Sequence, residues 1–191
     1  LFNHFCKERI ETGRMYVMNL DHCNDHSSFT DKIKMSNLCQ EITLPTTPLS
    51  HIDDNDDTSS EIALCVLSAV NLGAIKKLDE LEDTCTNIVR ALDSVIEYQS
   101  YPIGPSRKML KRRRIGVGIT NLAYYLAKNG VMYEDPEACN VVDEVMEHIQ
   151  YYMIKASVQL AKEKGKCEWF DRTKYSKGIL PIDTYCKSVD K

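Results

Sequence analysis

The sequence predicts an α/β layer architecture, because short apolar stretches of strand length alternate with segments of helical periodicity. Two apolar stretches, at 62–75 and 115–119, have the composition of buried strands. Each precedes a segment whose apolar residues recur three and four positions apart, at 78–98 and at 122–128. This alternation is typical of a sheet that is covered by helices.

The first thirty-five residues are expected to contain one helix, one strand and a loop. Residues 1–10 have helical spacing, and Gly13 is suited to end that helix. The short apolar stretch at 15–20 predicts a buried strand. Polar residues dominate 21–35, which indicates an ordered loop.

The middle of the chain leads into the most regular helical pattern. An extended piece is expected at 42–44, ahead of Pro45. Acidic residues dominate 51–60, which predicts a flexible, solvated loop. The stretch at 62–75 predicts a buried strand with a short apolar continuation. An amphipathic helix follows over 78–98 and ends before Pro102.

The second half of the chain repeats the strand and helix patterns. A basic stretch at 108–114 leads to the strand predicted at 115–119 and the helix predicted at 122–128. The longest helix is expected over 136–165, with a proline in its first turn and Gly165 at its end.

Composition excludes several classes of protein. The 24 Lys and Arg residues against 28 Asp and Glu give a net charge of −4, which does not favour non-specific binding to nucleic acid. The longest mostly apolar run, at 62–75, is shorter than the ~20 residues of a membrane-spanning helix. Eight cysteines without a C-x-x-C pair favour a reducing compartment, the cytoplasm, over a disulfide scaffold. The first residue is Leu1, already in helical spacing, so we expect a piece of a longer protein.

Two local patterns resemble metal sites but are incomplete. His22, Cys23 and His26 have partial zinc-ligand spacing, without a second cluster to supply further ligands. The stretch 53–64 imitates the start of a calcium-binding EF-hand loop, but its sixth and twelfth residues are Thr and Leu instead of Gly and Glu. We therefore predict no metal site in this chain.

Two further patterns resemble phosphate or nucleic-acid sites. Gly116 and Gly118 lack the third glycine of a dinucleotide-binding loop, and in a strand such glycines more often mark a close approach of two backbones. The basic run 112–114 has no interleaved aromatic residues, so we interpret it as a solvated rim beside a strand.

The segment around Cys39 combines residue types that are unusual together. If the segment is extended, Asn37, Cys39 and Glu41 project to one side, because successive side chains of a strand alternate. Asn and Glu are rarely buried without partners, so a thiol between them suggests a reactive site. A loop with an incidental buried cysteine explains the same spacing equally well.

Longer blocks of sequence resolve this choice by resemblance. Together with the Asn37-x-Cys39-x-Glu41 pattern they resemble, in the same order, the catalytic large subunit of class I ribonucleotide reductase, most closely that of bacteria and bacteriophages. The resemblance extends over essentially the whole chain. The blocks that carry it are 12–14, 21–24, 61–65, 123–128 and 177–185.

The resemblance implies a fold and a set of site residues. The fold would be part of a ten-stranded α/β barrel with an internal finger loop. Cys39 would become the thiyl radical that removes the 3′ hydrogen of the ribose, Glu41 would accept the 3′-hydroxyl proton, and Asn37 would bind the ribose hydroxyls. Cys65 would be one member of a redox-active disulfide whose partner lies outside this chain.

The resemblance also implies what must come from elsewhere. This segment would bind no cofactor or metal itself, since a metal-containing small subunit supplies the radical. ATP and deoxynucleotide effectors would bind in an N-terminal region outside this chain. Thioredoxin or glutaredoxin would restore the reduced thiols, and the substrate would be a ribonucleoside diphosphate held jointly with the remaining segments of the large subunit.

Two alternatives stay open beside this interpretation. The chain could be a non-catalytic or decayed derivative of the same fold, although the presence of Asn37, Cys39, Glu41 and Cys65 together favours an active enzyme. Class II reductases share the thiyl chemistry and are a minor alternative.

Overall fold

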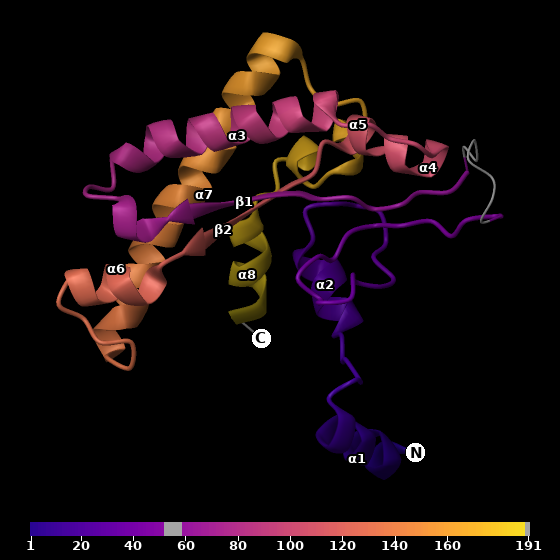
Figure 1. The fold of residues 1–191 in the computed structure, drawn as a ribbon. Coiled ribbons are helices and arrows are strands. Elements are labelled where there is room, and N and C mark those ends of the chain that lie inside the picture. Colours follow the sequence, from indigo (N-terminus) through magenta and orange to yellow (C-terminus); the bar gives the residue numbers. More distant parts are fainter. Residues whose placement is uncertain (52–58, 190–191) are drawn as a thin grey trace. The chain divides into compact units, whose positions relative to one another are not determined.

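The computed structural model describes residues 1–51 and 59–189, with side chains described up to residue 185 (Figure 1). The described chain divides into two compact units. The first consists of Leu1–Ala63, Ile103–Ser106 and Trp169–Lys191, and the second of Leu64–Pro102 and Arg107–Glu168. The predicted acidic loop at 51–60 lies largely outside the described residues.

The second unit is built on a parallel pair of strands, β1 (Val66–Asn71) and β2 (Ile115–Thr120), which lie side by side in Figure 1. Their register runs from Val66 beside Ile115 to Asn71 beside Thr120. Parallel strands need a long crossover, and its longest element is the helix α3 (Glu80–Tyr98). The short helix η1 (Leu72–Ala74) follows β1, and α5 (Met109–Arg112) precedes β2.

Two further helices follow β2. Helix α6 (Leu122–Lys128) begins directly after the strand, and α7 (Pro136–Lys164) carries its proline at the first helical turn, where the missing N–H costs nothing. Gly165 ends α7 with φ of 87°, and its N–H donates to the Ala161 carbonyl at 2.9 Å.

The core of the second unit lies where β1, α3 and α7 meet. The apolar face of α3 contacts that of α7, which α3 crosses in Figure 1. Because these helices repeat apolar residues three and four apart, each presents one continuous stripe to the other. The buried residues are Val70, Leu72, Ile75, Leu81, Cys85, Val145 and Ile149, with Val89, Ala156 and Leu160 in a second cluster.

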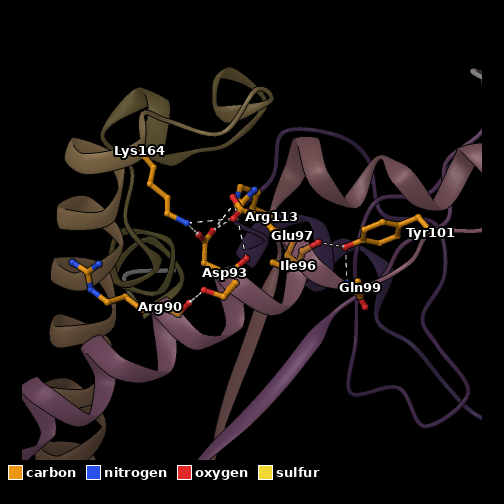
Figure 2. Close-up of polar contacts among 9 residues, drawn as sticks. Arg90, Asp93, Ile96, Glu97, Gln99, Tyr101, Arg113 and Lys164 are labelled. Atoms are coloured by element: carbon orange, nitrogen blue, oxygen red, sulfur yellow. Dashed lines mark hydrogen bonds and ion pairs between the residues drawn. The ribbon is translucent and has the colours of Figure 1, made fainter.

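An ion-pair network joins α3, the end of α7 and Arg113, the residue that follows α5 (Figure 2). Asp93 of α3 is only 8% exposed. Arg113 Nε donates to Asp93 Oδ1 at 2.6 Å, and Lys164 Nζ donates to Asp93 Oδ2 at 2.9 Å. Arg113 also pairs with Glu97 at 3.0 Å and has a left-handed backbone, with φ of 52°. One buried carboxylate thus holds cations from two different elements.

The first unit consists of helices and irregular chain in its described part. Its helices are α1 (Phe2–Thr12), α2 (Leu20–His26), α4 (Gly104–Arg107), whose last residue falls in the second unit, and α8 (Pro181–Val189), with short turns η2 (Phe170–Arg172) and η3 (Tyr175–Lys177). Two isolated antiparallel bridges, Phe29 with Thr173 and Thr47 with Glu61, tie its segments together.

The regular elements of the sequence-based prediction are confirmed. Helices α1, α3, α6 and α7 and strand β2 lie within a few residues of their predicted bounds. The strand predicted over 62–75 is confirmed only at its centre, as β1. Among its residues Val70 is buried, whereas Leu67 on the opposite face is 57% exposed.

Other predictions of the first unit are wrong. Residues 15–19 form no strand, because Tyr16 and Val17 are more than half exposed and Leu20 already begins α2. Helix α2 also replaces the first part of the loop predicted over 21–35. Residues 42–44 are neither helix nor strand, which does not contradict the extended piece predicted there. Among the described residues, no helix is both long and apolar enough to cross a membrane.

Candidate functional site

The segment around Cys39 is a tight turn, so the prediction of an extended segment is wrong. The Gln40 N–H donates to the Asn37 carbonyl at 3.2 Å, and the Asn37 N–H donates to the Ile42 carbonyl at 3.2 Å. Gln40 has φ of 63°, the left-handed conformation that follows the turn in many three-residue hairpin loops. Leu38 and Cys39 therefore occupy the apex of the turn.

The apex residues face solvent in this chain. Leu38 is 79% exposed, and the side chains of Cys39 and Glu41 are also exposed. Cys39 is a free thiol. These exposures contradict the interpretation of Cys39 as an incidental buried cysteine.

The side chain of Asn37 also stabilises the turn, a role that the sequence did not indicate. Its side-chain Oδ1 accepts a hydrogen bond from the Ile42 N–H at 3.0 Å and so helps to close the turn. Its amide Nδ2 makes no hydrogen bond within the part of the chain that the structure describes, so this donor remains available to a bound molecule.

The segment that leads into the turn is fixed by α2. The Asn24 side chain accepts from the Ile33 N–H at 2.8 Å and donates to the Ile33 carbonyl at 3.0 Å. Ile33 is 1% exposed, the most buried side chain of this segment. Lys174 donates to the Asp25 carbonyl at 2.6 Å and holds the end of α2. The segment that precedes the turn is thus held in place by its hydrogen bonds to Asn24 of α2.

A cavity of about 400 Å³ lies beside the base of the turn. Asn37, Ile42 and the 5% exposed Glu61 are among the residues that line it. Cys39 and Glu41 are not among its lining residues, so the cavity belongs to the base of the turn and not to its apex.

Cys65 belongs to the second unit and directly precedes β1. Its half-buried side chain is a free thiol. Burial raises the pKa of the Cys65 thiol, while the positive charge of Arg114 acts in the opposite direction. The strand register, continued by one residue, places Arg114 directly beside Cys65.

The run 112–114 is not the solvated rim that the sequence predicted. Arg112 and Arg114 are each 4% exposed, and Arg113 pairs with Asp93. Arg112 ends a short helix and Arg113 is left-handed, a local geometry that a linear charge pattern does not reveal.

The two glycines of β2 differ from each other. A methyl group at position 116 would lie 2.7 Å from Leu67 Cδ2 and 3.1 Å from Cys65 Sγ, whereas one at 118 would meet no atom within 4 Å. The close neighbours of Gly116 are side chains, so the predicted close approach of two backbones is found at neither glycine.

The remaining cysteine and histidine candidates have structural surroundings. Cys85 is fully buried, and burial raises its pKa to about 11. His26 stacks on Tyr185 with ring centroids 4.4 Å apart, and its Nδ1 lies 3.1 Å from Thr184 Oγ1. Within the described ranges, no three His, Cys, Asp or Glu side chains form a metal-binding group.

Comparisons with known proteins agree on one family. The family model described as "Ribonucleotide reductase, barrel domain" matches residues 1–191. The ribonucleoside-diphosphate reductase alpha subunit of Haemophilus influenzae is 53% identical over 100% of this chain and 25% of its own length. The corresponding subunits of Escherichia coli and of bacteriophage T4 are 53% and 41% identical over the same shares.

A solved structure gives the same result for the fold. The alpha subunit of the class Id ribonucleotide reductase of Actinobacillus ureae matches with a TM-score of 0.72 and 25% identity, over 87% of this chain and 32% of that chain. The chain spans about a quarter of the length of the curated relatives it matches. On the full-length match to the family model and the identity to these subunits, the chain belongs to the ribonucleotide reductase barrel-domain family, and its fold is part of that α/β barrel.

Proposed function

We propose that this chain supplies the radical-bearing loop and one reducing thiol of a ribonucleoside-diphosphate reductase alpha subunit. The observation that carries the proposal is the tight turn with the exposed Cys39 at its apex, in a chain that aligns throughout with such subunits. The chemistry needs a thiol that is held in one place and yet can reach a substrate.

Cys39 is suited to exchange a hydrogen atom with a sugar. An S–H bond is similar in strength to an activated ribose C–H bond, so a thiyl radical can remove the 3′ hydrogen and later return it. The two backbone hydrogen bonds of the turn restrict where the sulfur can lie. Such restriction favours the reaction, because a thiol that is already held in the reactive position loses less conformational freedom when it reacts.

Glu41 and Asn37 provide polar groups on the same turn. The Glu41 carboxylate would accept the 3′-hydroxyl proton as general base, which assists loss of the 2′ group. The Asn37 Nδ2 would donate to a ribose hydroxyl while Oδ1 keeps the turn closed. Asn37 would thus couple the position of the sugar to the shape of the loop.

Cys65 is assigned to the reduction step. The 2′-hydroxyl leaves as water, and the two electrons and two protons that balance this loss come from two thiols, which become a disulfide. Cys65 would be one of the two, and its partner would lie outside this chain. A reductant of the thioredoxin or glutaredoxin class would then restore both thiols.

The remaining partners follow from the same proposal. The radical would come from a metal-containing small subunit, and ATP or deoxynucleotide effectors would bind elsewhere in the large subunit. The substrate would be a ribonucleoside diphosphate. We assign the protein to the cytoplasm, because free catalytic thiols persist in a reducing compartment.

Two serine variants test the proposal in a complete alpha subunit that carries this segment, assayed with its small subunit. Cys39→Ser should keep nucleotide binding but form no deoxynucleotide, because a serine O–H bond is too strong to exchange hydrogen with ribose. Cys65→Ser should allow the first radical step and then release decomposed nucleotide. Cys139→Ser, an exposed cysteine of α7, is the matched control.

Normal turnover in Cys39→Ser would remove this residue from the mechanism. A wild-type subunit that binds nucleotide but never turns over would instead favour the non-catalytic alternative.

A further inference from the structure

Gly116 of β2 lies against the sulfur of Cys65. A methyl group at this position would lie 3.1 Å from Cys65 Sγ, tighter than nine in ten Cβ contacts in proteins, and 2.7 Å from Leu67 Cδ2. Gly118, two residues along the same strand, has open space in the same direction. The two glycines therefore form a natural pair for comparison.

The strand register explains why these atoms meet. Gly116 lies beside Leu67, and side chains two residues apart in a strand project to the same face. Cys65, Leu67 and Gly116 therefore share one face of the sheet. Leu67 is 57% exposed and can turn toward solvent, whereas the half-buried thiol of Cys65 has less room to move.

We propose that Gly116 is a positioning residue for the Cys65 thiol, because the missing side chain leaves the space that this sulfur occupies and through which a reactant reaches it. The role deepens the proposed function of Cys65 and rests on it for the effect on turnover. Disulfide bonds form within narrow limits of distance and angle, so a displacement of a few tenths of an ångström at one sulfur matters.

The test compares Gly116→Ala with Gly118→Ala in a complete alpha subunit. The rate at which iodoacetamide alkylates Cys65 is followed by peptide mass spectrometry across a range of pH, with the exposed Cys139 as internal reference. The plateau rate at high pH reports access to the sulfur, and the midpoint reports its ionisation.

We expect Gly116→Ala to lower the plateau rate at Cys65 by about tenfold, the scale of a moderate overpacking strain. Gly118→Ala should leave it within about twofold, since its methyl group meets no neighbour. Alkylation of Cys139 should not change. An unchanged or faster rate in Gly116→Ala, or an equal loss in Gly118→Ala, would overturn the proposal.

A double variant separates the two contacts of the added methyl group. Leu67→Ala/Gly116→Ala removes the tighter clash with Leu67. The double variant can therefore be used for the alkylation test if Gly116→Ala alone does not fold. The slow alkylation of Cys65 should persist in the double variant, with Leu67→Ala as its reference. Recovery of the wild-type rate would show that the effect runs through Leu67 and would refute a role toward the thiol.

Steady-state turnover of the same variants provides an independent test of the proposal. Gly116→Ala should lower kcat at unchanged KM, because reduction and not substrate binding is affected. If Cys65→Ser turned over normally, the proposed function of Cys65 would fail, while the alkylation result would still decide whether Gly116 positions the thiol.

Discussion

Gln40 adopts a backbone conformation that is unfavourable for its residue type. A non-glycine residue in the left-handed region costs roughly 1–2 kcal/mol, and here it allows the turn to close behind Cys39. The side chain of Gln40 thus matters less than the backbone conformation at its position.

We therefore predict opposite outcomes for two substitutions of Gln40. Gln40→Gly should keep turnover, because glycine adopts positive φ without strain. Gln40→Val should lower kcat by about tenfold or more, because a β-branched residue strongly disfavours this conformation and displaces Cys39. Steady-state reduction of a ribonucleoside diphosphate measures both, and equal kcat values would contradict the importance of the turn.

Arg114 opposes the effect of burial on Cys65, and its removal should be visible in the ionisation of that thiol. The guanidinium stabilises the thiolate, so Arg114→Met should raise the pKa of Cys65 further and move the midpoint of its alkylation to higher pH. At a fixed pH below that midpoint, alkylation becomes slower. Arg114→Lys, which keeps a positive charge, is the matched control, and a midpoint that does not differ between the two variants would exclude the charge effect.

At the scale of elements, the ion pairs that join α3 and α7 differ in how far they are buried. Asp93 is buried and holds both Arg113 and Lys164, whereas Arg90 and Glu163 pair at 2.7 Å with side chains 44% and 38% exposed. Exposed pairs contribute little, because water screens them and both side chains lose freedom.

We predict that Asp93→Ala lowers the free energy of unfolding by about 3 kcal/mol, since two cations lose a buried carboxylate. Arg90→Met, at the same interface, should lower it far less, because water already screens this exposed pair. Urea unfolding of the complete subunit measures both variants. Similar losses would mean that the burial of Asp93 does not set its contribution.

The same elements show what the sequence could predict and why. Helices α3 and α7 were predictable because their apolar periodicity is long and local. Helices α2 and α8 were missed because they are short and rich in polar residues, and 15–19 was misassigned because its apolar residues are exposed in this chain.

The candidate site likewise has features that the sequence could predict and features that it could not. The identities of Asn37, Cys39 and Glu41 were available from the resemblance, but the turn depends on the φ angle of Gln40, which no residue pattern encodes. The relation of Gly116 and Arg114 to Cys65 depends on a register between strands far apart in sequence. Such register follows from packing, so it became visible only in the fold.

For the whole molecule, the sheet of the second unit is incomplete as a folding unit. Within the described residues it has two strands, and such a pair is marginal without further partners. Apolar side chains such as Leu67, Val17 and Ile182 are also more than half exposed.

We predict that residues 1–191 expressed alone associate and do not reduce nucleotides. Unpaired strand edges and exposed apolar surface recruit other chains, and under the proposed function the partner thiol of Cys65 lies outside this chain. Size-exclusion chromatography and a ribonucleoside diphosphate reduction assay test the two parts. A monodisperse monomer that unfolds cooperatively would contradict the first part, and unaided turnover the second.

The register of β1 and β2 also has a consequence for the order of folding during synthesis. Val66 and Ile115 are 49 positions apart, so the two strands can pair only after β2 has been synthesised. Their pairing also closes a long loop, which costs conformational entropy. Helix α3 forms from local contacts, and the Arg113–Asp93 contact then closes a loop of only 20 positions. We infer that α3 forms first in the nascent chain, that Arg113 then pairs with Asp93 of α3, and that the two strands pair last. Until β2 emerges, Cys65 lacks the neighbouring strand and the fold that half-bury its thiol, so the sulfur is fully exposed during that part of synthesis.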